Sequence, residues 1–170
     1  MLDELGVVSC WGYNHYGPSQ PPPTSFVNFD STSAVGCGLR DSGTVECWGW
    51  PDEGQLEVPD EAFVEVSVGG GHVCGLTEER ALQCWGEVRD GGELPAGDGP
   101  YASLSAGHRM TCVLDELGAL SCWAPQASDP RSAELSEEVP TAGEFVQVSV
   151  GYDFACALDH DGRAICWGSD

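Results

Sequence analysis

Short segments in which apolar and polar residues alternate recur along the chain. In residues 63–68, Phe-Val-Glu-Val-Ser-Val, the alternation runs through most of the segment. A period of two residues is typical of a β-strand with one buried face. A glycine run at 69–71 follows this segment, and Gly107 and Gly151 follow two others. We therefore expect each of these strands to end in a tight turn.

One unit repeats along the chain. A Cys-Trp pair occurs five times, and its Trp residues lie 37, 37, 38 and 44 residues apart. Spacings of this size are typical of propeller blades and other repeat arrays. In the last four copies an aromatic residue stands eleven places before a cysteine, which in turn stands ten places before the Cys-Trp pair. The pairs are Cys10-Trp11, Cys47-Trp48, Cys84-Trp85, Cys122-Trp123 and Cys166-Trp167, and the aromatic residues are Phe26, Phe63, Tyr101 and Phe145.

The spacing between the two cysteines of a unit predicts a β-hairpin. If Cys37 lies opposite Cys47 on antiparallel strands, residues 41–43 form a three-residue loop. Such a loop ends in a residue of left-handed conformation, which glycine adopts at little cost. The residues at this place are Gly43, Arg80, Gly118 and Gly162. We expect Arg80 to carry modest strain there.

Both faces of each predicted sheet are apolar, because Cys and Leu point to one face and Trp to the other. Each sheet must then be covered on both sides, which stacking of successive blades achieves. We predict an all-β fold, a β-propeller or propeller-like array of about four and a half blades built from antiparallel hairpins. Residues 1–170 form a single repeat domain, with a half repeat at 1–12 and full motifs at 26–49, 63–86, 101–124 and 145–168.

Residues 66–76, Val-Ser-Val-Gly-Gly-Gly-His-Val-Cys-Gly-Leu, followed by Cys84-Trp85-Gly86, resemble the regulator of chromosome condensation repeat. The resemblance is to its Cys-rich bacterial form, similar to propeller-type β-lactamase inhibitor proteins, and covers nearly the whole chain. It implies a propeller but says little about function, because the family includes nucleotide-exchange regulators, β-lactamase inhibitors and many secreted proteins. Family propellers usually have seven blades, so this chain departs from them in blade count.

Eight of the nine cysteines form four sets with the same ten-residue spacing. Opposed residues on antiparallel strands lie close enough for a disulfide, so we expect four within-blade disulfides, with buried free thiols as the alternative. Disulfides require an oxidising compartment, which places the protein outside the cell or in a periplasm. The expected pairs are Cys37 with Cys47, Cys74 with Cys84, Cys112 with Cys122, and Cys156 with Cys166. Cys10 is left unpaired or available for an intermolecular bridge.

The chain is strongly acidic. It has 28 Asp and Glu residues against 6 basic ones, all Arg, and a formal net charge of -22. Binding to nucleic acid or to an anionic membrane is disfavoured, because no basic stripe is present. The acidity is typical of a well-solvated surface, with a basic partner protein or Ca²⁺ as the other interpretations. The sequence contains no run of 18 apolar residues and no signal-peptide pattern.

No catalytic motif is found in the sequence. A Gly-x-Ser-x-Gly elbow, a phosphate-binding loop and a His-Glu-x-x-His motif are all missing. The four His do not recur in register and no Cys-x-x-Cys occurs, so we expect no metal site. His72 falls at a mostly apolar repeat position, so we expect it to be a packed core residue. The chain is expected to have no cofactor and no enzymatic activity.

The leading hypothesis is a non-catalytic, secreted propeller that recognises a protein partner through the loops between repeats. Trp50 lies outside the repeat register, which makes it the strongest single anchor candidate. The inner turns offer a second surface. The candidate partner-binding residues are Tyr13, His15, Tyr16, Trp50 and Arg89 on connecting loops, and His108, Arg109, Tyr152 and Asp153 on inner turns. The alternative is a structural protein that self-associates head to tail into a ring or filament, neighbouring subunits completing its partial blades.

Overall fold

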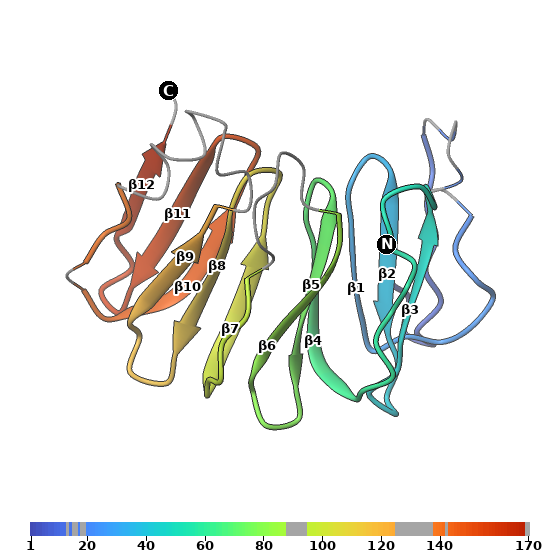
Figure 1. The fold of residues 1–170 in the computed structure, drawn as a ribbon, viewed down its shortest axis with the longest axis horizontal. Coiled ribbons are helices and arrows are strands. Elements are labelled where there is room, and N and C mark those ends of the chain that lie inside the picture. Colours follow the sequence, from blue (N-terminus) through green and yellow to red (C-terminus); the bar gives the residue numbers. More distant parts are fainter. Residues whose placement is uncertain are drawn as a thin grey trace.

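The computed structural model describes residues 1–12, 14, 17, 20–87, 95–124, 138–141 and 143–168. Within these ranges the chain forms twelve strands and no helix, arranged as four three-stranded antiparallel sheets (Figure 1). We number the sheets as blades 1 to 4 along the chain. Blade 1 contains β1 (Asn28–Ser31), β2 (Val35–Leu39) and β3 (Val45–Gly49); blade 2 contains β4 (Phe63–Val68), β5 (His72–Thr77) and β6 (Leu82–Gly86); blade 3 contains β7 (Tyr101–Ala106), β8 (Thr111–Asp115) and β9 (Leu120–Trp123); blade 4 contains β10 (Phe145–Val150), β11 (Phe154–Asp159) and β12 (Ala164–Gly168).

The hairpin in each blade has the predicted register. Cys37 lies opposite Cys47, and the corresponding cysteines oppose each other in the other three blades. All four expected disulfides are formed, with Cα atoms 4.0 or 4.1 Å apart. The loop-closing residues are in the left-handed region, including Gly43 at φ 82° and Arg80 at φ 63°. The chemistry of a three-residue turn therefore overrides the steric preference of Arg80.

The core lies between the blades. Since successive residues point to opposite sides of a strand, each blade has a Cys face, which carries the disulfide, and a Trp face, which carries the Trp of the Cys-Trp pair. At the first junction, Cys37 and Leu39 on the Cys face of blade 1 pack with Phe63 and Trp85 on the Trp face of blade 2. The next two junctions repeat this arrangement. Stacking therefore covers both faces of the inner blades, as the sequence predicts.

Small residues allow the aromatic side chains to lie flat on their own blades. A methyl group at Gly38 would overlap the ring of Phe26, and one at Gly75 would overlap the ring of Phe63. The Phe63 ring also lies 5.3 Å from that of Trp85, centroid to centroid. The Trp face of blade 2 is therefore flat enough to receive the Cys face of blade 1.

Residues 1–12 form a short turn that packs against blade 1. Leu2 pairs with Val8, and Gly6 closes the turn between them at φ 78°. Val8 packs against Phe26 and Trp48 and so covers part of the Trp face of blade 1. In the described residues the blades stand in an open row, with blade 1 at one end and blade 4 at the other (Figure 1).

Candidate functional site

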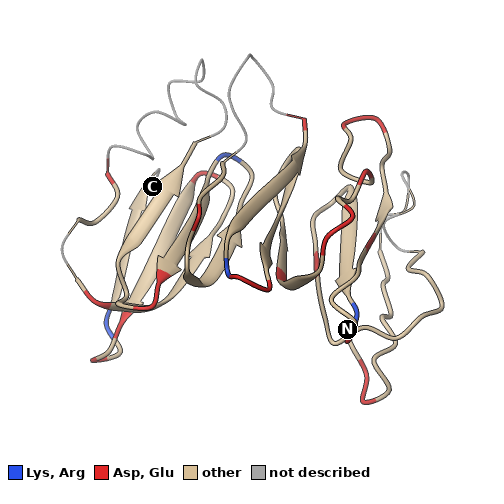
Figure 2. Cartoon of the chain, turned by 60° about the horizontal axis from the view of Figure 1, so that its bottom comes forward, with Lys and Arg blue, Asp and Glu red and all other residues tan. Residues whose placement is uncertain are grey.

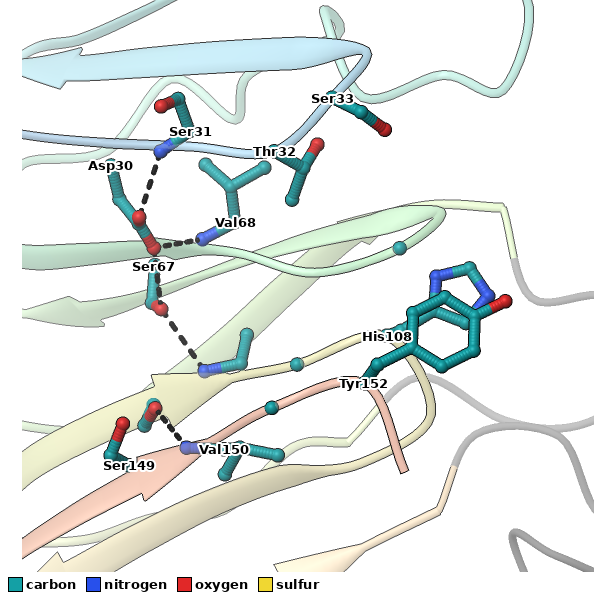
Figure 3. Close-up of a pocket in the computed structure, with 15 residues that line it drawn as sticks. Asp30, Ser31, Thr32, Ser33, Ser67, Val68, His108, Ser149, Val150 and Tyr152 are labelled. Atoms are coloured by element: carbon teal, nitrogen blue, oxygen red, sulfur yellow. Dashed lines mark hydrogen bonds between the residues drawn. The ribbon is translucent and has the colours of Figure 1, made fainter. Parts of the chain in front are cut away.

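The four inner strands, β1, β4, β7 and β10, lie side by side, and their ends line a cavity of about 630 Å³ (Figure 3). Its walls are rich in hydroxyl groups. Ser31, Thr32 and Ser33 come from blade 1, whereas His108 and Tyr152 come from the inner turns of blades 3 and 4. The cavity is therefore a polar hollow along the inner edge of the stack.

A repeated set of hydrogen bonds joins consecutive blades at this edge. At each junction, a side-chain oxygen four residues after the strand-leading aromatic accepts a backbone N–H from the next inner strand. The bonds are Val68 N to Asp30 Oδ2 at 2.8 Å, Ala106 N to Ser67 Oγ at 3.0 Å, and Val150 N to Ser105 Oγ at 3.0 Å. We call this set the inner ladder. The corresponding position in blade 4 is Ser149.

Asp30 is the single carboxylate in the inner ladder, where the other blades have Ser. Its Oδ2 also accepts from Ser67 Oγ at 2.9 Å, and its Oδ1 accepts from Ser31 N at 2.7 Å. These three donors stabilise the Asp30 carboxylate with hydrogen bonds from its own strand and from the next blade. Asp30 therefore serves the junction between blades 1 and 2 while it faces the cavity.

Four side chains of the inner turns of blades 3 and 4 meet beside the cavity. The rings of His108 and Tyr152 are stacked, with centroids 4.0 Å apart and planes at 10°. Arg109 Nε lies 2.6 Å from Asp153 Oδ1, and the guanidinium carbon lies 5.7 Å from the centre of the Tyr152 ring. We call these four residues the turn cluster. The structure thus brings together all four inner-turn residues that the sequence singles out, and their role in binding stays a prediction.

A buried histidine joins blades 2 and 3 next to this edge. His72 is 2% exposed, and its Nε2 lies 2.6 Å from Oγ1 of the fully buried Thr111. Burial and, secondly, the positive charge of His108 lower the pKa of His72 from 6.5 to about 4. The imidazole is therefore neutral at physiological pH, and His72 is the packed core residue that the repeat register predicts.

The connecting-loop candidates have different outcomes. Trp50 is half-buried and packs against the core between blades 1 and 2, together with Leu56 and Val58. It is held there by its backbone N–H, which donates to Ala34 O at 2.9 Å. Trp50 thus has a packing role, and its partner-anchoring role stays a prediction. The other four loop candidates, Tyr13, His15, Tyr16 and Arg89, lie outside the described residues.

Acidic residues are spread over the turns and edges of the blades, whereas Arg residues are few (Figure 2). Each Arg in the described ranges has an acidic neighbour. The pairs are Arg40 with Glu46, Arg80 with Glu65, Arg109 with Asp153, and Arg163 with Asp161. The described surface therefore has many carboxylates without a cationic neighbour.

The part of the chain that the structure describes contains neither a candidate metal-binding cluster nor a candidate membrane-spanning helix. No three His, Cys, Asp or Glu side chains there are grouped so that they could hold a metal ion. No helix in that part combines the length and the apolar character needed to cross a membrane.

Residues 63–91 and 145–170 match the family model of the regulator of chromosome condensation (RCC1) repeat. No curated protein matches the chain significantly. The architecture is also similar to that of several solved propellers. The CRINKLY WD40 ectodomain of the Arabidopsis thaliana receptor kinase ACR4 has 24% identity and a TM-score of 0.73, covering 98% of this chain and 58% of its own.

Two further solved structures share this architecture. The ectodomain of the Physcomitrella patens receptor kinase CR4 has 28% identity and a TM-score of 0.75, covering 97% of this chain and 44% of its own. Yeast RCC1 (Prp20), solved with Kap60, has 18% identity and a TM-score of 0.66, covering 92% and 45%. The chain thus spans about half the length of these three structures.

Proposed function

Because residues 63–91 and 145–170 match the RCC1 repeat and the described blades form a propeller-like stack, we propose that this chain is a non-catalytic module that binds a protein partner. The turn cluster is the observation that carries this proposal. Tyr152 is 58% exposed, yet its ring is fixed by stacking on His108. An exposed aromatic ring that loses little freedom on binding is a typical interface anchor.

The net charge of the chain indicates which kind of protein partner to expect. A net charge of -22 repels phosphate backbones and favours encounter with a basic protein surface. Similar folds also occur in proteins with protein partners: yeast RCC1 (Prp20) was crystallised with Kap60, and Prp20p was described with its binding properties to Gsp1p and histones. We therefore propose a basic protein as the partner.

The proposed location is outside the cell or in a periplasm. Four disulfides, one in each blade, form and persist in oxidising compartments. Two similar structures are ectodomains of plant receptor kinases, which supports the same location.

The test compares Tyr152→Ala with Leu117→Ala, which alters an 82% exposed residue on the turn between β8 and β9. A basic partner is isolated under oxidising conditions by cross-linking, and its affinity for each variant is measured by calorimetry. Tyr152→Ala should weaken the complex by about 2 kcal/mol, roughly 30-fold, with unchanged thermal stability. Equal affinities for Tyr152→Ala and the unmodified chain would reject the turn cluster as the anchor.

A second candidate function, head-to-tail self-assembly, is favoured by apolar side chains at opposite ends of the row. Trp11 is 74% exposed beside blade 1, and Phe154 is 50% exposed on blade 4. Contacts of this heterologous kind lead to rings or filaments. Light scattering after gel filtration tests this candidate, since a mass of 18.0 kDa at every protein concentration would contradict it.

A further inference from the structure

The Cys face of blade 4 differs from the other three Cys faces in its exposure. Cys37, Cys74 and Cys112 are all 0% exposed, because the Trp face of the following blade covers them. On blade 4, Phe154 is 50% exposed, and Ala164 is also exposed. A face with the composition of a packed interface therefore has no neighbour among the described residues.

The inner ladder also ends at blade 4 with one acceptor unused. Ser149 Oγ stands at the ladder position, and no described residue donates a hydrogen bond to it, whereas Ser105 Oγ accepts from Val150 N (Figure 3). A series of backbone hydrogen bonds between blades ends at blade 4 too. His108 N donates to Gly151 O at 3.2 Å, but the next N–H in this series, that of Tyr152, meets no acceptor in the described ranges.

The junctions between the described blades show which groups can pair with Ser149 Oγ and the Tyr152 N–H. Between blades 3 and 4, Ser105 Oγ accepts from Val150 N while His108 N donates to the carbonyl of the next residue, Gly151. The junction between blades 2 and 3 has the same pattern, with an N–H from Ala106 and a carbonyl from Gly107. The matching ligand is an extended backbone that presents the N–H of a small apolar residue and the carbonyl of the residue after it.

We propose that the Cys face of blade 4 and the end of the inner ladder dock an extended, basic peptide segment of the partner protein. This docking site rests on the protein-binding function proposed above and adds a second contact to it. The backbone of the segment would bind Ser149 Oγ and Tyr152 N–H, and its apolar side chains would cover Phe154 and Ala164. A second copy of the chain fits less well, because two chains of net charge -22 repel each other.

A basic segment is favoured by the carboxylates around this face. Asp153 directly precedes β11, Asp159 is its last residue, and Asp161 lies on the following turn. Arg109 and Arg163 offset the charge of Asp153 and Asp161, respectively. The excess negative charge of the whole chain still attracts Lys or Arg residues that flank the apolar core of the segment.

The experiment uses a synthetic peptide, acetyl-Tyr-Ala-Ser-Leu-Ser-Ala-Gly-His-Arg-amide, which copies residues 101–109. In the chain, this segment makes the proposed contact at the junction between blades 2 and 3. Amide NMR spectra of the oxidised 170-residue chain are recorded during titration at low salt. The largest shifts should map to Ser149, Tyr152, Phe154 and Ala164, and replacing the peptide Arg by Glu should weaken binding at least about 3-fold.

Variants of the protein distinguish peptide docking at this site from peptide binding elsewhere on the chain. Ser149→Ala should weaken the peptide about 3- to 10-fold, the loss expected for one hydrogen bond. Ala164→Asp should abolish binding, whereas Leu117→Asp adds the same charge on a distant turn and should not affect it. Ser149 and Ala164 are exposed, so both variants should keep the thermal stability of the unmodified chain.

Shifts elsewhere, no shifts at millimolar peptide, or equal effects of Ala164→Asp and Leu117→Asp would each overturn this docking site. A dimer in light scattering that Ala164→Asp dissociates would identify a second copy as the occupant, and the proposal would be wrong. A partner complex weakened by Tyr152→Ala but insensitive to Ala164→Asp would reject this docking site while the proposed function stands.

Discussion

His72 should make the stability of the fold depend on pH. In the folded chain, burial and the charge of His108 lower the pKa of His72 from 6.5 to about 4. Between these two values the unfolded chain binds a proton that the folded chain does not bind. The stabilising contribution is therefore complete above pH 6.5 and is lost progressively as the pH falls toward 4.

The size of this effect follows from the two pKa values. With pKa values of 6.5 unfolded and about 4 folded, proton uptake lowers the free energy of unfolding by about 2 kcal/mol at pH 5.0 relative to pH 7.5. Urea unfolding at the two pH values, followed by Trp fluorescence, measures the change. Carboxylates also titrate toward pH 5, so the unmodified chain by itself does not isolate the contribution of His72.

His72→Met is the matched control, because Met110 occupies the corresponding position in blade 3 and is equally buried. The substitution removes the titrating group and leaves every carboxylate in place. The loss of stability between pH 7.5 and 5.0 should be about 2 kcal/mol smaller in His72→Met than in the unmodified chain. The reasoning is refuted if the two proteins show the same pH dependence.

Three further predictions concern the blades. Peptide mapping by mass spectrometry without reduction should find the four within-blade bridges, and replacing Cys112 and Cys122 together by Ala should lower the free energy of unfolding by about 2 to 3 kcal/mol; free thiols at these positions would contradict the structure. Arg80→Gly should be more stable than Arg80→Ala by about 0.5 to 1 kcal/mol in thermal unfolding, because φ is 63° there, and the reverse order would mean a different loop. Ser67→Ala should lower the free energy of unfolding by about 1 to 3 kcal/mol, because it leaves the buried Ala106 N–H without an acceptor. If Ser67→Ala has as small an effect as Ser149→Ala, the inner ladder does not stabilise the fold.

The repeat made the fold of the blades predictable. A fixed spacing between Cys37 and Cys47 allows one hairpin register with a three-residue loop, and the alternation of Cys and Trp requires cover on both faces. Both constraints can be read from the sequence without knowledge of the tertiary contacts, because the first is local and the second recurs in every repeat. The packing of Trp50 was not predictable in this way, because its loop has no counterpart in the other repeats.

The positions of the inner ladder can be recognised in the sequence, whereas the hydrogen bonds that they make cannot. Asp30, Ser67, Ser105 and Ser149 each stand four residues after the strand-leading aromatic, and each carries a side-chain oxygen. A polar residue that recurs in register on a buried strand needs a hydrogen-bond partner, and the adjacent blade is the nearest source of one. The same register also identifies Ser149 as the member that lacks a following blade among the described residues.

One position of the inner turns varies in size from blade to blade. It lies in the turn between the first and second strands of each blade and outside the core clusters between blades. The four residues at this position are Ser33, Gly70, His108 and Tyr152. Large rings occur only in blades 3 and 4, and there they stack on each other beside the cavity. A methyl group at Gly70 would overlap the ring of His108, so Gly70 leaves room for this ring at the junction between blades 2 and 3. Because Ser33 and Gly70 close the same turn without a ring, we predict that the stacked rings of His108 and Tyr152 contact a ligand beside the cavity.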